Sequence, residues 1–551
     1  MWISTKGKVI NLAIVGFAFG PIFMVAQESK NLGIEHVIVI GFDGLSPDGL
    51  HNSNTPIFDS LKNEGAYTMH ARAILPTSSS PNWASMIMGA GPEQHGITSN
   101  AWERDNFTLP AITQGDDFLF PTIFRLLDEQ KKDVEIGIVY DWDGFGRLFE
   151  KSAVDYDINP ENEDETAIVA SNYIIDKKPD LTFLHFDHVD HAGHEFGHGT
   201  EEYYTSVEKA DELLGKVIEA IKKAGILDSS MVIISSDHGG LGKGHGGETL
   251  QEIEIPFILW GKSVKKNHKI EHPVYQYDNA ATVAYALGLK APNAWIGKPV
   301  KSAFIGYEAK DGYPILEQSE PPIILPKSKG YKKAGGLFDD STLVSIKNPT
   351  EDGIVRYTLN GSMPSSDSPI AEGLISLDKN TVVKSAIFKE DKIRSEVAEA
   401  YFRIKSKNTI KPVNYEIFYL KDLRFIPALD NRKPDVTGSC YEITSAEIEN
   451  LIKGNTAVRF KSQIIIEQSG MYQFYTRSDD GSKLFVDDQL VVDNDGDHGV
   501  REKEGQIHLK PGAHHLEVVW FNGGGDGWLD VYVETDKMPK QIVSTTLLRT
   551  K

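Results

Sequence analysis

Residues 36–42 read HVIVIGF, a short apolar run that Asp43 follows directly. A run of this kind is typical of a strand buried on both faces of a parallel sheet. Similar runs recur at 135–140, 181–186, 231–235 and 255–260. Helical patterns lie between them, the clearest at 201–224, where apolar residues follow one face and Gly225 ends the pattern. The alternation predicts an α/β domain with a mostly parallel sheet over residues 33–313.

The composition narrows the classes of function. With 551 residues, the chain is long enough for about two to four folded domains. Its net charge of −22 disfavours a nucleic-acid polymer as partner, because the phosphates would be repelled. Cys440 is the only cysteine. The sequence therefore offers neither an intramolecular disulfide nor a thiolate metal cluster, and any metal site must use His, Asp and Glu.

The N-terminus has the features of an export signal, residues 1–26. Lys6 and Lys8 precede an uncharged run from 9 to 26, and Ala26 is a plausible cleavage point. The run also approaches the length of a membrane span, so a retained anchor is the alternative. The polar residues that follow favour cleavage. We therefore expect an exported, periplasmic or extracellular protein without a membrane partner after cleavage.

The alternation of strands and helices ends at residues 314–336, a Pro-, Lys- and Gly-rich segment typical of a linker. Short strands and turn signals then fill residues 337–405, and residues 410–551 continue the pattern. Two β-sandwich-like modules are therefore expected after the α/β domain. Within the second one, we predict a strand, an acidic turn and a strand over 470–486, a hairpin over 506–520 and a helix over 445–452.

Side chains suited to metal binding follow several predicted strands, where ligands gather in α/β sheets. They are Asp43, Asp190, His194, Asp237, His238 and His245. Each alone is more often a helix cap or a structural group, but six at strand ends are hard to explain by packing. One zinc takes about four ligands, so this set suffices for two ions. Carboxylate and imidazole without thiolate suit Zn²⁺, with Mn²⁺ or iron as alternatives.

Residues 76–100 contain the candidate nucleophile, Ser79, just before Pro81. Proline suits the first turn of a helix, and the free N–H groups of a helix start can cradle a phosphate. A Ser-Pro pair before an apolar run is more often a plain helix cap, so its meaning depends on the six ligands. Neighbouring hydroxyls that compete for the role are Thr77, Ser78 and Ser80.

Together these motifs resemble the alkaline phosphatase superfamily and, within it, the nucleotide pyrophosphatase/phosphodiesterase branch. The resemblance covers about residues 36–305. It implies that one zinc ion, which activates the nucleophile, is held by Asp43, Asp237 and His238. It implies that a second zinc ion is held by Asp190, His194 and His245. Four further histidines crowd the second set and are expected to support it or to lie at the surface: His185, His188, His191 and His198.

The resemblance also assigns the chemistry. The family's nucleophile position, usually Thr, falls on Ser79, which is thereby also expected to bind the metal. The Asn that steadies a phosphoryl oxygen falls on Asn82. The implied reaction is in-line attack on a phosphate ester through a phosphoserine intermediate. A sulfatase-like hydrolase is the alternative within the superfamily, but its pattern has an arginine where this chain has Trp83.

The two β modules also resemble known families. Residues 337–405 resemble the immunoglobulin-like domain at the ends of chitobiases and β-hexosaminidases. Residues 410–551 resemble the protective-antigen-type β-sandwich, which implies a glycan partner. Asp479 and Asp480 could hold Ca²⁺ in an acidic turn, and a solvated hairpin is the alternative.

The sequence therefore predicts an exported two-zinc phosphoric-ester hydrolase that its C-terminal half tethers to a glycan. The alternative from another class is a carbohydrate-binding adhesin whose α/β domain is catalytically idle. The sequence leaves open whether the substrate is a monoester, a diester, a pyrophosphate or a phosphonate.

Overall fold

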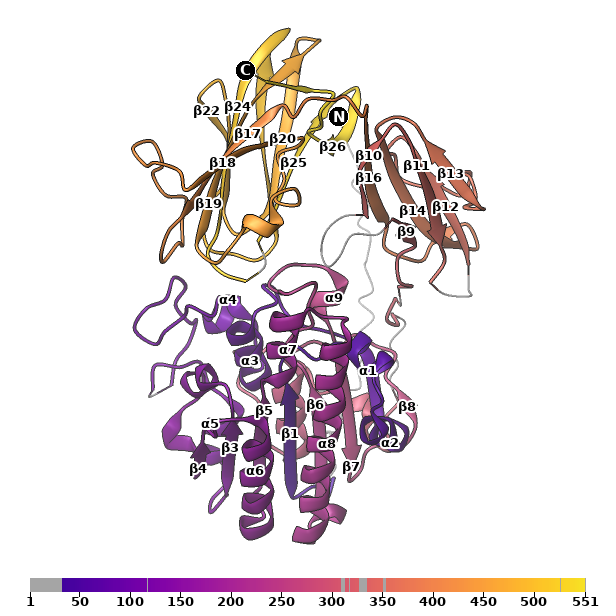
Figure 1. Cartoon of the computed structure of the whole chain (residues 1–551). Helices are drawn as coiled ribbons and strands as arrows, with labels where there is room; N and C mark the ends of the chain where they lie inside the picture. Colours follow the sequence, from indigo (N-terminus) through magenta and orange to yellow (C-terminus); the bar gives the residue numbers. More distant parts are fainter. Residues whose placement is uncertain are drawn as a thin grey trace, which may run out of the picture.

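The computed structural model describes residues 32–115, 117–308, 313–316, 318–326, 334–349, 353–525 and 527–550. It consists of an α/β module and two β modules that lie beyond one end of its sheet (Figure 1). The predicted export signal, residues 1–26, falls outside the described residues. Among the residues described, no helix combines the length and the apolar character needed to cross a bilayer.

An eight-stranded sheet forms the centre of the first module, in the order β4-β3-β5-β1-β6-β7-β2-β8. The strands are β1 (His36–Phe42), β2 (Ala66–Arg72), β3 (Ile136–Tyr140), β4 (Tyr156–Ile158), β5 (Leu181–Phe186), β6 (Ser230–Ser235), β7 (Glu254–Gly261) and β8 (His268–Lys269). From β4 to β6 all neighbours are parallel, whereas β7 runs antiparallel to both β6 and β2. The prediction of a mostly parallel sheet is confirmed, and the run at 255–260 is its antiparallel member.

Helices cover both faces of this sheet (Figure 1). They are α1 (Pro47–Asn52), α2 (Pro56–Glu64), α3 (Ser79–Met88), α4 (Pro92–His95), α5 (Ile123–Gln130), α6 (Glu163–Lys177), α7 (His188–Phe196), α8 (Glu201–Ala224), α9 (Leu250–Ile253) and α10 (Asp278–Ala286). Along β1, Val37 and Val39 pack into one hydrophobic core and Ile38 and Ile40 into the other. This alternation explains why the strand is apolar throughout. The helix predicted at 201–224 has those bounds.

The second module is a pair of packed sheets. Its strands are β9 (Ile323–Leu325), β10 (Ala334–Asp339), β11 (Thr342–Lys347), β12 (Ile354–Thr358), β13 (Leu374–Leu377), β14 (Thr381–Lys389), β15 (Lys392–Ile393) and β16 (Ala398–Lys405). One sheet has the order β10-β16-β14-β12, with β15 beside β14, and the other β13-β11-β9. Strand β9 lies inside the predicted linker, 314–336, and pairs antiparallel with β11. Ile324 explains this correction, because its side chain is buried in the core of the module.

The third module is a larger two-sheet sandwich. Its strands are β17 (Val413–Tyr419), β18 (Val436–Cys440), β19 (Thr456–Ile466), β20 (Gly470–Asp479), β21 (Ser482–Val486), β22 (Gln489–Asn494), β23 (Arg501–Leu509), β24 (Gly512–Asn522), β25 (Trp528–Thr535), β26 (Met538–Ile542) and β27 (Leu548–Arg549). One sheet has the order β18-β17-β19-β24-β21-β22, with β27 beside β19, and the other β23-β20-β25-β26.

Two local predictions for the third module are wrong. The segment 506–520 is not a hairpin, because β23 and β24 belong to different sheets and the turn between them crosses the sandwich. The segment 445–452 forms only a short 3-10 helix, η5 (Glu449–Leu451). Ser445, at the start of this segment, is bonded to β25 instead of beginning a helix. Its backbone N–H donates to the Leu529 carbonyl, and its hydroxyl accepts from the Leu529 N–H.

The two β modules pack against each other. The ring of Tyr401 contacts that of Tyr532, with centroids 5.2 Å apart. Beside them, Arg403 donates to both carboxylate oxygens of Glu442, at 3.1 Å from Nε to Oε1 and 2.7 Å from Nη2 to Oε2. Because Glu442 is almost fully buried, this ion pair is a fixed part of the interface.

Candidate active site

The first predicted ligand group forms at the carboxyl ends of the neighbouring strands β1 and β6. Asp43 follows β1, and Asp237 and His238 follow β6. The His238 Nε2 atom lies 3.1 Å from Asp237 Oδ2 and 3.5 Å from Asp43 Oδ1. All three side chains are buried, with exposed fractions of 1%, 0% and 0% in chain order. Their spacing suits one metal ion.

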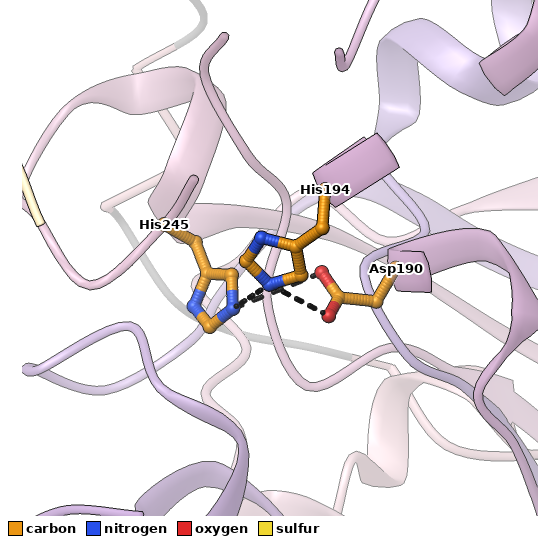
Figure 2. Close-up of side chains that lie close together, drawn as sticks. All are labelled: Asp190, His194 and His245. Carbon is orange, nitrogen blue, oxygen red and sulfur yellow. Dashed lines mark hydrogen bonds and ion pairs between the residues drawn. The ribbon is translucent and has the colours of Figure 1, made fainter. Parts of the chain in front are cut away.

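The second predicted group also comes together (Figure 2). Asp190 and His194 lie one turn apart on α7, and His245 comes from the loop before α9. His194 Nε2 lies 3.2 Å from Asp190 Oδ2 and 3.1 Å from His245 Nε2. The His194 side chain is 48% exposed. The second group therefore reaches solvent at His194, whereas the first is enclosed.

A glycine brings the two groups together. Gly44 has φ +69°, and a Cβ built on it would lie 2.8 Å from the Cα of Asp190. Only a residue without a side chain allows the end of β1 to approach α7 this closely. The ring of His238, from the first group, stacks on that of His245, from the second, with centroids 3.7 Å apart. The two ligand groups are therefore in direct contact.

The orientation of the imidazoles tests whether these residues fit metal ions. The Nδ1 atoms of His194, His238 and His245 lie 2.9, 2.8 and 2.8 Å from the backbone carbonyls of Lys243, Gly239 and Thr77. A proton on each Nδ1 leaves a lone pair on each Nε2, the atom that faces the carboxylates. Within the described part of the chain, each aspartate of the two groups has one buried carboxylate oxygen that lacks a hydrogen-bond partner: Asp43 Oδ1, Asp190 Oδ1 and Asp237 Oδ2. Buried acceptors without donors fit cations.

The electrostatics of the groups agree with this. Burial, together with the charges of Asp43 and Asp190, raises the pKa of Asp237 well above its usual value. Burial lowers the pKa of His238 to about 4, so this ring is a neutral ligand near pH 7. The hydrogen bond to Asp190 raises the pKa of His194 to about 9. Divalent cations would offset the repulsion among the carboxylates and displace the proton from His194.

Ser79 lies beside the first group. It is the first residue of α3, and its Oγ is 3.4 Å from His238 Nε2. Two of the competing hydroxyls are engaged elsewhere. Thr77 donates to the Gly247 carbonyl at 2.7 Å, and the Ser80 hydroxyl accepts from Arg147 at 2.9 Å. Among the candidate hydroxyls, all within the described residues, Ser79 is the one that contacts the first ligand group.

Asn82 has a structural role that its motif did not indicate. Its Oδ1 accepts from the Ile74 N–H at 2.7 Å, and its Nδ2 donates to the carbonyls of Pro76 and Ser78, both at 3.0 Å. These bonds hold the turn before α3 and leave neither amide proton for a phosphoryl oxygen. An amide that the motifs missed, Asn100, is exposed at the same helix start, where its Oδ1 accepts from the Ser80 N–H.

The other four histidines occupy different environments. His191 is exposed, His188 lines a cavity of about 440 Å³ beside α7, and His185 is fully buried next to Asp43. His198 is buried, with its Nε2 3.9 Å from Asp190 Oδ1. One aspartate of each ligand group therefore lies next to a buried imidazole, Asp43 next to His185 and Asp190 next to His198, as expected for residues that support ligands.

The third module meets the α/β module near the second group. A Cβ built on Gly499 would lie 2.9 Å from the carbonyl oxygen of His245. The Gly499 loop is held by Asp480, whose oxygens accept from the N–H groups of His498 and Gly523 at 3.0 and 2.8 Å. In the described residues, the sets of three or more candidate metal ligands all lie in the α/β module. The calcium interpretation of Asp479 and Asp480 stays a prediction.

Comparison with known families gives one matching family model for each of the three modules. Residues 37–118 and 138–242 match the family model described as type I phosphodiesterase/nucleotide pyrophosphatase. Residues 333–399 match the chitobiase/β-hexosaminidase C-terminal domain, and residues 404–546 match the PA14 domain. The resemblances predicted from the motifs are therefore confirmed for all three modules.

Individual relatives match the α/β module at low identity. Human bis(5′-adenosyl)-triphosphatase ENPP4 is 25% identical over 213 residues, which cover 37% of this chain and 47% of the relative. An uncharacterized pyrophosphatase/phosphodiesterase of Schizosaccharomyces pombe is 26% identical over 251 residues, covering 42% and 49%. This chain thus spans about half the length of these relatives.

Two solved structures illustrate the similarity. Murine ectonucleotide pyrophosphatase/phosphodiesterase 5, in an inactive form with AMP, has 17% identity and a TM-score of 0.40 over 47% of this chain and 96% of its own. BT1596, a 2-O GAG sulfatase, has 15% identity and a TM-score of 0.42 over 65% and 86%.

Proposed function

We propose that this protein is a metal-dependent phosphodiesterase or nucleotide pyrophosphatase in which Ser79 is the nucleophile. The observation that carries the proposal is the position of the Ser79 hydroxyl, 3.4 Å from His238 Nε2 at the edge of the first ligand group. The second group adjoins the first through the stacked rings of His238 and His245. Two ions held side by side can serve the attacking and the leaving oxygen of an in-line displacement.

The metal supplies Lewis-acid chemistry when bound: it lowers the pKa of a hydroxyl and stabilises developing negative charge. The six predicted ligands would hold two ions, and the set of carboxylates and imidazoles favours Zn²⁺, with Mn²⁺ or iron as alternatives. Asp43, Asp237 and His238 would hold one ion next to Ser79. Asp190, His194 and His245 would hold the other on the solvent side.

The reaction proceeds in two displacements. The Ser79 Oγ attacks phosphorus as its proton leaves, the bond to the leaving oxygen breaks, and a phosphoserine ester forms. Water then attacks the same phosphorus, the bond to Oγ breaks and the serine is regenerated. At the start of α3 the Ser80 N–H is bonded to Asn100 Oδ1 and Pro81 has no N–H, so the Ser79 N–H is the one that would face an equatorial oxygen. The helix dipole favours negative charge at this position.

A Ser79→Ala variant tests the nucleophile. It should abolish hydrolysis of bis(p-nitrophenyl) phosphate while the number of metal ions bound per chain stays the same. Ser78→Ala is the matched control and should remain active. Activity retained by Ser79→Ala would reject the nucleophile, and activity unchanged after chelation would reject the metal requirement.

We propose a nucleotide-type pyrophosphate or phosphodiester as the substrate class, which the names of the sequence relatives support. We further propose that the protein is exported and that the third module holds a glycan, with Ca²⁺ at Asp479 and Asp480. The PA14 match and the signal-like residues 1–26 support these proposals. The idle-domain adhesin is the less favoured alternative, because such a protein would not need six converging ligands.

A further inference from the structure

His185 lies at the centre of the sheet, close to the carboxyl end of β5. The strand register places it between Gly41 of β1 and Tyr140 of β3. Its side chain is 0% exposed. The aromatic rings around it belong to Trp83, Phe145 and Trp142, whose centroids lie 4.6, 5.4 and 6.1 Å from that of the imidazole. This enclosure means that the polar partners of the imidazole are protein groups.

Those partners are two carboxylates on opposite sides. His185 Nε2 lies 3.4 Å from Asp43 Oδ2, and Nδ1 lies 3.4 Å from Asp141 Oδ1. Both contacts are at ion-pair distance, and neither ring nitrogen makes a hydrogen bond within the described residues. Asp141 is fixed in turn, because its Oδ1 accepts from the Asp187 N–H at 2.8 Å. His185 therefore connects a predicted metal ligand to a carboxylate that the backbone at the start of α7 holds in place.

The two oxygens of Asp43 face different surroundings. Oδ1 faces His238 and lacks a hydrogen-bond partner within the described part of the chain, so it is available to an ion. Oδ2 accepts from Trp83 Nε1 at 2.9 Å and faces His185. Ligand carboxylates are generally oriented by such outer contacts, and removing one typically costs about 10- to 100-fold in metal affinity.

We propose that His185 is a positioning residue for the first ion: its Nε2 side holds Asp43 so that Oδ1 points into the site, and Asp141 orients His185. This inference rests on the proposed function only in requiring that the first group binds metal. It does not depend on Ser79 or on the substrate. An inactive protein with intact metal binding would refute the proposed chemistry and leave this inference standing.

The experiment measures Zn²⁺ binding to the first group alone. The full-length chain carries His194→Ala to remove the second group, and Zn²⁺ dissociation constants come from competition with a chelator. His185→Leu should weaken binding about 10- to 100-fold. His185→Gln should restore part of the loss, because its amide nitrogen reaches the position of Nε2. His185→Asn should not, because its amide nitrogen takes the position of Nδ1.

A control and two further outcomes complete the test. His191→Gln, at a side chain that is 75% exposed, should bind Zn²⁺ as the parent does. Equal losses in the Leu, Gln and Asn variants would indicate packing alone and overturn the proposal, as would unchanged affinity in His185→Leu. If His185→Leu does not fold, the comparison of Gln with Asn decides.

The same side chain has one competing role. Asp43, His185 and Asp187 lie close enough to bind an ion of their own. Metal analysis of the native chain should give two ions per chain. Three ions, falling to two in His185→Leu, would make His185 a ligand and overturn the proposed positioning role.

Discussion

Trp83 offers the sharpest test of the first ligand group. Its indole N–H donates to Asp43 Oδ2 at 2.9 Å, and its ring is 0% exposed. Trp83→Phe removes this donor and keeps an aromatic side chain, although it also removes the outer indole atoms over Gly41, where a Cβ would lie 2.4 Å from Cη2. A hydrogen bond to a charged group contributes about 1.5–3 kcal/mol, so Zn²⁺ affinity at the first group should fall about 10- to 150-fold.

The assay is competition with a chelator, as for His185, combined with thermal melts of the metal-free protein. Trp295→Phe is the matched control, because it removes the same atoms from a buried indole that donates to the Pro121 carbonyl at 3.1 Å, outside both ligand groups. Both variants should lose stability through the smaller ring, typically by about 1–3 kcal/mol. Only Trp83→Phe should lose Zn²⁺ affinity, and equal affinity in the two variants would refute the reasoning.

Three further predictions concern stability and the module contacts. Burial lowers the pKa of His95 to about 3. In the unfolded chain, His95 takes up a proton below its ordinary pKa of about 6.5. The free energy of unfolding should therefore fall by about 2 kcal/mol from pH 7 to pH 5, and by less in His95→Gln, as urea titrations would show. Gly499→Val should change kcat/KM for substrates with large leaving groups, whereas Gly454→Val, in open space, should not. Arg403→Met should lower the melting temperature, because it leaves a buried carboxylate unpaired at a cost of about 3–5 kcal/mol.

The convergence of the candidate ligands was predictable because two physical rules act at the same edge of the sheet. Strands buried on both faces are continuous apolar runs, so β1 could be bounded at 36–42 from the sequence alone. The carboxyl ends of parallel strands meet at one edge, so polar residues just beyond those runs converge. This places Asp43 beside Asp237 although they are far apart in the sequence.

What the sequence missed depends on contacts between distant segments. Strand β7 is as apolar as its parallel neighbours, and its direction is set by the connections around it rather than by its own residues. The turn between β23 and β24 has hairpin residues, but each strand pairs with a different sheet. Asn82 fits a catalytic motif, but its amide nitrogen donates hydrogen bonds to the carbonyls of Pro76 and Ser78. The motif does not reveal these bonds.

The two ligand groups differ in their exposure to solvent, and in the proposed reaction this difference would decide on which side each step takes place. The first group is enclosed and Ser79 is 6% exposed, whereas His194 is 48% exposed. We therefore expect the leaving group to depart, and water to arrive, on the side of the second group. The His245 loop forms part of that side, and the third module touches it at Gly499. Selection among leaving groups should accordingly depend on this loop and on the third module, whereas attack by the proposed nucleophile, Ser79, should depend on the first group.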